Sequence, residues 1–224
     1  MKKIAFVLVA ALLMPLCVTA QKKKKADVRT FNDCYIYGNS NRNAAKKGSA
    51  MSLTDGTTYS LENAYNIAGE KYIDVMLFHG KAYGGKEYVF HLFAPDDPSI
   101  TINWQKDGGT SPYCKFEGKG EQPDSYFALK NWKKRNATKL VKVTGVDFDN
   151  IDSEAIAALP IEDSYHASDI KVGDIILFEL AATSAKPGKK GLMKITAIEN
   201  DPDKPDKRGD GKYQKMIMDI KIQK

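Results

Sequence analysis

KMIMDIKIQ, residues 215–223, carries an apolar side chain at every second position. Its two faces hold Met216, Met218, Ile220 and Ile222 on one side, and Ile217, Asp219 and Lys221 on the other. A period of two is typical of a β-strand that buries one face. Similar stretches at Asp174–Leu180 and Leu192–Ile198 precede it, separated by the turn 186–191 and the polar loop 200–211. The sequence therefore predicts a three-stranded antiparallel meander at the C-terminus.

Short strand patterns also occur through the rest of the chain. The expected strands are Val28–Tyr37, Thr57–Ile67, Tyr72–His79, Glu87–Phe93, Ile100–Trp104, Tyr113–Phe116 and Lys139–Phe148. Tyr72–His79 is apolar on both faces, which indicates a central strand, and Glu87–Phe93 is its expected hairpin partner. The pair Asp55-Gly56 marks a turn.

Two helices are expected between these strands. Asp124–Arg135 has apolar residues near helical spacing and a basic last turn, and Ser153–Leu159 follows a capping residue, Asp152 or Ser153, and stops at Pro160. The predicted fold class is all-β: an antiparallel β-sandwich with two short helices and a C-terminal three-stranded meander. We expect residues 28–160 to form the main sandwich domain and residues 161–224 a meander lobe packed on it.

The N-terminus has the order and length of a secretory signal. Two lysines follow Met1, an apolar run covers residues 4–16, and Val18-Thr19-Ala20 offers a cleavage site before Gln21. The run is too short for a stable membrane anchor. We therefore expect residues 1–20 to be removed from an exported protein that is periplasmic, outer-membrane-associated or extracellular. Lipidation at Cys17 is the alternative to cleavage after Ala20.

Charge is distributed unevenly. The whole chain has a net charge of +6, but residues 26–224 carry 28 basic and 28 acidic side chains. A neutral body lacks the clustered positive charge of a nucleic-acid-binding domain, so we expect no nucleic-acid partner. The block Lys22–Lys25, within residues 21–27, is expected to be a solvated basic tether; contact with anionic lipid head groups or acidic polysaccharide is the alternative.

Two cysteines remain after the leader. In an oxidising compartment Cys34 and Cys114 could form a disulfide that closes a loop of about 80 residues. Two separately buried thiols are the alternative. A catalytic thiolate is disfavoured, because only Lys115 among the sequence neighbours of the two cysteines would lower a thiol pKa.

Three histidines, His79, His91 and His166, raise the question of a metal site. The simplest hairpin register, centred on Tyr83, places His79 and His91 on one face but four residues apart, roughly 13 Å at the rise of a strand. Two side chains at that separation do not close on one zinc ion. We therefore expect neither a histidine metal site nor a cofactor.

Two acidic loops resemble calcium-binding segments only in composition. Residues 147–152 and 201–210 are rich in aspartate, yet the second fails the calcium-loop pattern at its fifth, sixth and twelfth positions, and the first adjoins a helix that needs a cap. The chain contains no Gly-x-Ser-x-Gly or phosphate-binding Gly-Lys-Ser/Thr motif. No catalytic residue is therefore predicted.

Aromatic side chains in expected loops are the best candidates for ligand contact. Tyr83, Trp104 and Tyr113 fall in or beside loops, where rings can stack on sugars or fill an interface. Trp132 is expected to anchor a helix in the core instead. These three aromatic residues are the predicted ligand-binding set.

The C-terminal hairpins resemble those of a known group. Gly191–Ile198 and Met216–Gln223, preceded by Lys171–Ile176, are similar to the ending of many uncharacterised secreted β-rich proteins of Bacteroidota-type bacteria, and the Ala20-Gln21 boundary is similar to theirs. The resemblance covers about 55 residues. It implies an exported or cell-envelope β protein and supplies no catalytic residues.

Three functions remain open at this point. The first is a non-enzymatic binding module for a glycan or an envelope protein. The second is a periplasmic glycan hydrolase that uses a pair of carboxylates, whose spacing the sequence does not identify. The third is a structural envelope or assembly protein.

Overall fold

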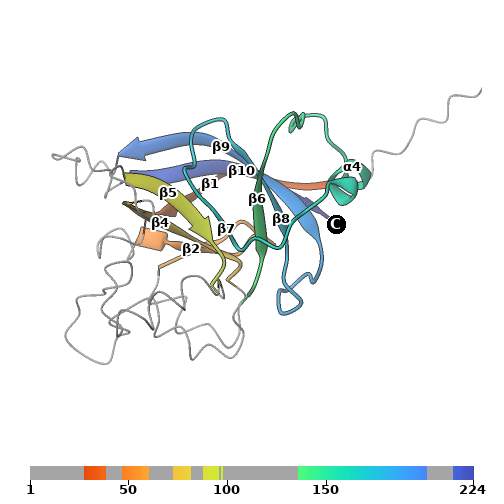
Figure 1. Cartoon of the computed structure of the whole chain (residues 1–224), viewed down its shortest axis with the longest axis horizontal. Coiled ribbons are helices and arrows are strands. Elements are labelled where there is room, and N and C mark those ends of the chain that lie inside the picture. The colour runs from red at the N-terminus through yellow and green to blue at the C-terminus, as the bar shows by residue number, and fades with distance from the viewer. Residues whose placement is uncertain are drawn as a thin grey trace, which may run out of the picture.

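The computed structural model describes residues 28–38, 47–60, 73–81, 88–95, 97, 136–200 and 214–224. These residues form two five-stranded antiparallel sheets (Figure 1). In spatial order the first sheet contains β1 (Val28–Tyr37), β10 (Gln214–Gln223), β9 (Lys190–Asn200), β8 (Ile175–Glu179) and β6 (Lys139–Val143). The second contains β3 (Thr58–Tyr59), β2 (Ala50–Met51), β4 (Val75–Lys81), β5 (Tyr88–Phe93) and β7 (His166–Ala167).

An apolar layer joins the inner faces of the sheets. The first sheet contributes alternate residues of β10, and all four apolar positions predicted to face inwards are fully buried: Met216, Met218, Ile220 and Ile222. Val75 and Leu77 from β4 belong to the same cluster. The chain is therefore an all-β, sandwich-like protein, and the predicted C-terminal meander is confirmed as β8, β9 and β10.

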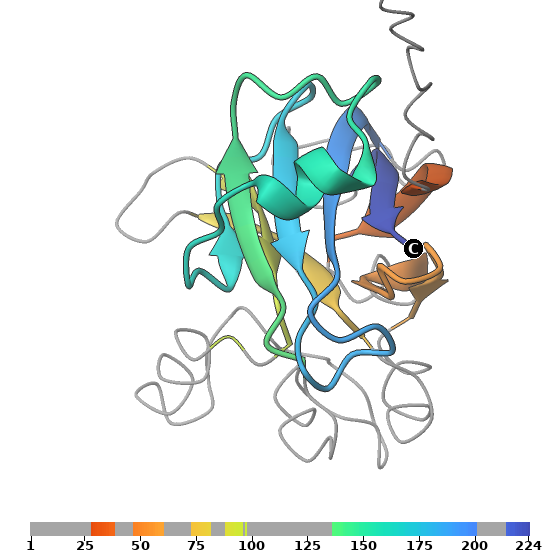
Figure 2. The same ribbon diagram turned by 90° about the vertical axis from the view of Figure 1, so that its right-hand side faces the viewer.

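A second apolar cluster covers the outer face of the first sheet. Helix α4 (Ser153–Ala158) inserts Ile156 against Leu177 and Leu192, beside Phe148 from the preceding loop. Figure 2 shows the helix in front of the strands that it covers. The carboxylate of Asp152 accepts a 2.8 Å hydrogen bond from the backbone N–H of Ala155, which confirms the predicted cap. The other predicted helix, Asp124–Arg135, lies outside the described residues.

Most predicted strands agree with the structure where it describes them. β1 has the expected bounds, and β4 is central, between β2 and β5. β6 ends at Val143 rather than Phe148, because the chain turns at Gly145, which has a φ of +72°. The two-residue strands β2 and β7 were not predicted. The expected strands Ile100–Trp104 and Tyr113–Phe116 lie outside the described residues.

The predicted register of the β4–β5 hairpin is wrong. Position 79 lies opposite Phe90, and His91 lies opposite position 78, three residues away from the predicted alignment. Positions 79 and 91 are therefore one step apart along the ladder rather than four, and an odd step changes the face of the sheet. A short turn fixes the register of a hairpin, but a long connection does not. The predicted register, symmetric about Tyr83, was therefore one of several that the sequence allowed.

Both sheets contain strands from either side of residue 160. In the first sheet β1 pairs with β10 and β6 pairs with β8, while in the second β5 pairs with β7. The predicted boundary between residues 28–160 and 161–224 therefore does not separate one sheet from the other. The meander shares a hydrophobic core with strands from the N-terminal half.

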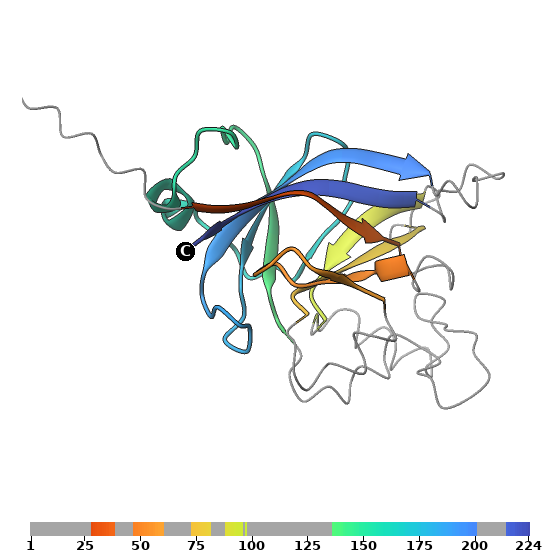
Figure 3. The ribbon, with the colours of Figure 1, turned by 180° about the vertical axis from the view of Figure 1, so that it is seen from behind.

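Hydrogen bonds connect the sheets at both edges. At one edge, the backbone N–H of Leu140 donates to the carbonyl of Ser164, and that of Ala94 donates to the carbonyl of Tyr165. At the other edge, the hydroxyl of Thr58 donates to the carbonyl of Tyr35. Figure 3 shows this second edge from behind, with β1 beside β10 and the short strands of the second sheet beneath it. The second edge contains the pocket described below.

Gly191 provides a test of the close packing within the first sheet. A Cβ atom at this position would overlap the ring of Phe178 and the carbonyl oxygen of Lys221. We expect Gly191→Ala to lower the free energy of unfolding by about 1–3 kcal/mol in urea denaturation. The control is Thr196→Ala on the exposed face of the same strand, for which a change within about 0.5 kcal/mol is expected. Equal effects of the two substitutions would contradict the packing described.

Candidate functional site

Most residues predicted to contact a ligand lie outside the described part of the chain. This applies to Tyr83, Trp104 and Tyr113, and to the tether Lys22–Lys25. Cys34 is described and carries a free thiol. Its predicted disulfide partner, Cys114, lies outside the described residues, so the disulfide stays a prediction.

A pocket of about 400 Å³ opens between β1 and the turn that precedes β3. Its volume falls within the range of small-molecule sites, about 300–1,000 Å³. Two aromatic rings, two carboxylates, an amide, a hydroxyl and a thiol surround it. The lining residues are Phe31, Asn32, Asp33, Cys34, Tyr35, Asp55, Gly56 and Thr58. We call this site the bulge pocket.

A β-bulge in β1 forms one wall of the bulge pocket. Phe31 pairs with Ile220 and Cys34 with Met218, so β1 has one residue more than β10 between these pairs. Asp33 absorbs the extra length in the left-handed region, with a φ of +54°, a conformation that aspartate tolerates better than most residues. The backbone N–H of Asp33 donates to the carboxylate of Asp219 at 3.0 Å. A side chain of β10 thus replaces the ladder bond that the bulge removes.

The Asp55-Gly56 turn forms the opposite wall. The carboxylate of Asp55 accepts a 3.0 Å hydrogen bond from the backbone N–H of Thr57, which closes the turn locally. Gly56 has a φ of +72°, and a Cβ atom there would lie 2.8 Å from the sulfur of Cys34. Glycine is therefore required both by the turn and by its approach to β1. The sequence predicted both this turn and β1, but not that the two face each other.

Several polar groups of the pocket are not used by the fold. Within the described part of the chain, the side chains of Asn32 and Asp33 make no hydrogen bond or ion pair, and Asp55 uses one carboxylate oxygen. The Tyr35 ring is 45% exposed and packs edge-on against Tyr37, with 5.9 Å between ring centroids. The residues that line the pocket therefore include an exposed tyrosine and uncommitted hydrogen-bonding groups.

The pocket does not activate its thiol. Burial raises the pKa of Cys34 to about 11, and the charges of Asp219, Asp33 and Asp55 act in the same direction. At neutral pH the sulfur is therefore a thiol rather than a nucleophilic thiolate.

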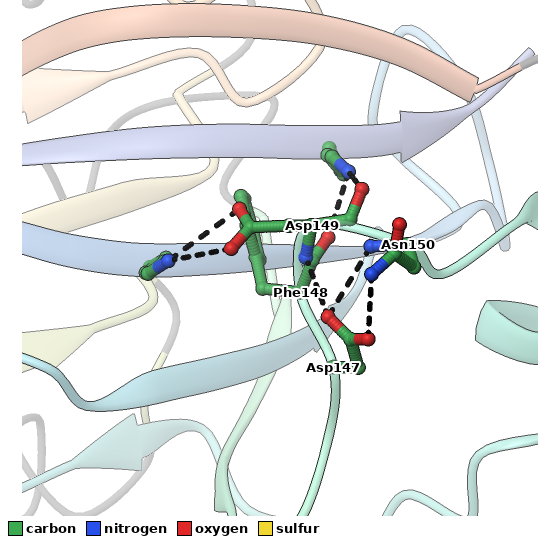
Figure 4. Close-up of polar contacts among 6 residues, drawn as sticks. Asp147, Phe148, Asp149 and Asn150 are labelled. Carbon is green, nitrogen blue, oxygen red and sulfur yellow. Dashed lines mark hydrogen bonds and ion pairs between the residues drawn. The ribbon is translucent and has the colours of Figure 1, made fainter.

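The aspartate-rich loop 147–152 is not arranged around a cation site. Asp147 accepts hydrogen bonds from the backbone N–H groups of Asp149 and Asn150 and from the side-chain amide of Asn150 (Figure 4). The hydrogen bond from this amide is the largest cause that lowers the pKa of Asp147. The ammonium group of Lys221 donates to the carbonyls of Phe148 at 2.7 Å and Asp149 at 2.8 Å. Lys194 lies 3.2 Å from the Asp149 carboxylate.

Lysine ammonium groups therefore take the place of a cation in this loop, and both also lie over the ring of Phe148. Across the described ranges, no group of three or more His, Cys, Asp or Glu residues could hold a metal ion. The other acidic loop, 201–210, lies outside the described residues.

The chain matches no family model, and comparisons with curated proteins and with solved structures gave no significant match. In the part of the chain that the structure describes, no helix combines the length and apolar character needed to cross a membrane.

The lysine contacts of loop 147–152 make a testable pair. Lys221→Met removes a charged donor from two carbonyls, and we expect it to lower the free energy of unfolding by about 1–2 kcal/mol in urea denaturation. Lys194→Met removes an exposed ion pair and a contact with the face of the Phe148 ring, and it is expected to cost less than about 1 kcal/mol. Millimolar calcium should leave the melting temperature of the wild type unchanged. A calcium-dependent rise, or a larger effect at Lys194, would contradict this assignment.

Proposed function

We propose that the protein is an exported, non-enzymatic binding module of the cell envelope and that its bulge pocket binds a glycan. The observation that carries the proposal is that Tyr35, which is 45% exposed, lines the same pocket as Asn32 and Asp33, whose side chains are uncommitted. The two edges that form the pocket belong to different sheets of a rigid scaffold. Such a scaffold holds contact groups in place before the ligand arrives.

The chemistry of the pocket suits a sugar ring. An aromatic face packs on the apolar C–H face of a pyranose, while carboxylate and amide groups accept and donate hydrogen bonds at its hydroxyls. Asp33 and Asp55 offer acceptors on opposite walls, and Asn32 offers both donors and acceptors. A metal-dependent or thiol-based reaction has no support in these groups.

The cellular setting of the proposal comes from the sequence. The leader of residues 1–20 directs the protein out of the cytoplasm, to the periplasm, the outer membrane or the exterior, and Lys22–Lys25 add peripheral contact with an anionic surface. Tyr83, Trp104 and Tyr113 stay predicted ligand contacts from the sequence. An envelope protein is the alternative partner.

A second candidate function is glycan hydrolysis. Asp33 and Asp55 place two carboxylates in one pocket, as general acid–base or nucleophilic cleavage of a glycosidic bond requires. The two functions share a ligand class and differ in whether a bond is broken. They are therefore separated by product formation rather than by binding.

The binding proposal is tested by screening the purified protein on a glycan array and measuring affinity for the best ligand by calorimetry. Tyr35→Ala should weaken binding roughly two- to tenfold, the effect of losing about 0.5–1.5 kcal/mol of ring packing. Asn32→Ala should also weaken it. Val172→Ala, at an exposed apolar residue outside the pocket, is the matched control and should bind as the wild type does. Absence of any glycan ligand, or equal effects of Tyr35→Ala and Val172→Ala, would refute the proposal.

The hydrolase alternative is tested on the same glycans by assaying reducing ends. A binding module releases none, and Asp33→Asn and Asp55→Asn then change affinity only. Release by the wild type that either substitution abolishes would replace the binding module with the hydrolase.

A further inference from the structure

Two buried aspartates lie at the end of the sandwich where β4 begins and β5 ends. Asp74 directly precedes β4 and Asp97 follows β5; because position 76 pairs with Phe93, both belong to the same end of the hairpin. Asp74 is fully buried and Asp97 is 3% exposed. Buried carboxylates are costly unless they have partners, so the contacts of these two residues indicate what they do.

Asp74 connects the second sheet to the first. Its carboxylate accepts hydrogen bonds from the backbone N–H of Leu53 at 2.8 Å, the amide of Asn136 at 2.7 Å and the hydroxyl of Ser184 at 2.8 Å. Asn136 precedes β6 and Ser184 follows β8, both strands of the first sheet. Asn136 is itself oriented by the hydroxyl of Thr183, which donates to its side-chain oxygen at 2.7 Å.

Asp97 holds the short strand β7 through a histidine. Its carboxylate lies 3.4 Å from Nδ1 of His166, whose side chain is 48% exposed. The segment around β7 is hydrogen-bonded to both sheets, since Tyr165 accepts from Ala94 and Ser164 accepts from Leu140. His166 and Asp97 therefore fasten the strand that joins the sheets at this edge.

We propose that Asp74 and the Asp97–His166 pair form a pH-sensitive clasp at this end of the sandwich, which makes the folded state more stable in mild acid than above neutral pH. The device is built from the fold itself and does not depend on the ligand of the bulge pocket. Its two parts act on the same end of the sandwich and respond to pH in the same direction.

The direction follows from the protonation states of the folded protein. Burial is the largest cause that raises the pKa of Asp74 to about 6, against the three hydrogen bonds, which lower it. The folded state therefore favours the protonated carboxyl, and the stability this contributes is present at low pH and lost as the pH rises through about 6. The hydrogen bond to Asp97 raises the pKa of His166. The stability that this pair contributes to the folded state is therefore present below the ordinary histidine pKa and is lost as the pH rises above that value.

The other charged groups described near the clasp do not reverse this direction. The charge of Asp55 adds to the rise at Asp74. Beside β7, Lys139 lies 2.9 Å from Asp163 and 3.2 Å from Glu179, and hydrogen bonds to these two carboxylates raise its pKa, so it stays charged throughout. Nδ1 of His91 lies 3.1 Å from the hydroxyl of Ser168.

Proton NMR titration of the folded protein tests the histidine part, since the chain has only three histidines to resolve. His166→Gln identifies the His166 resonance, and this half-exposed position should tolerate the change. We expect a midpoint above the ordinary value of about 6.5. Asp97→Asn should bring the midpoint back down. A midpoint at or below 6.5 in the wild type would overturn the histidine part, whether or not the Asp97 variant folds.

Carboxyl-carbon NMR of the wild type tests Asp74, whose midpoint should lie near 6 rather than near 3.8. Urea denaturation at pH 5.5 and pH 8.5 then tests the clasp as a whole. His166→Gln should lower the unfolding midpoint at pH 5.5 and leave it close to that of the wild type at pH 8.5. Lys171→Gln, at an exposed ion pair with Asp169, is the control and should differ little from the wild type at either pH. An effect of His166→Gln that is the same at both pH values would overturn the proposal.

Discussion

The burial of alternate side chains between two twisted sheets is the interaction on which the rest of this structure depends. β10 lies between β1 and β9, and its four inward-facing residues pack against side chains such as Val75 and Leu77 from the other sheet. Each fully buried side chain of this kind contributes about 1.5–3 kcal/mol relative to exposure.

The bulge pocket and the buried aspartates both lie at the edges of this apolar layer. At one edge, the bulge in β1 interrupts the ladder with β10, and Asp219 satisfies the freed N–H of Asp33. The irregular backbone exposes Asn32 and Asp33 beside Tyr35, and the Asp55-Gly56 turn closes the pocket from the other sheet. A binding site therefore forms where the regular pairing of strands is broken, which is a common role for bulges.

At the opposite edge, hydrogen bonds and charges replace apolar contact. β7 is only two residues long and cannot bury enough surface to join the sheets by itself. His166 and Asp97 add an ion pair there, and Asp74 collects donors from segments of both sheets. Buried polar groups of this kind specify one arrangement of the strands, because any other would leave a carboxylate without partners.

The sequence by itself determined the fold class, the C-terminal meander, the bounds of β1, the central place of β4 and the Asp152 cap. All of these follow from side chains near one another along the chain, through a period of two or a capping pattern. The tertiary structure alone decided the register of β4 with β5, the existence of β2 and β7, and the grouping of Asp33, Tyr35 and Asp55 into a pocket. Strands of two residues have no period to read, a long connection does not set a register, and a bulge depends on the strand opposite. The candidate site could therefore not be found from the sequence, because its two walls come from different sheets and are brought together by the tertiary structure rather than by any local pattern.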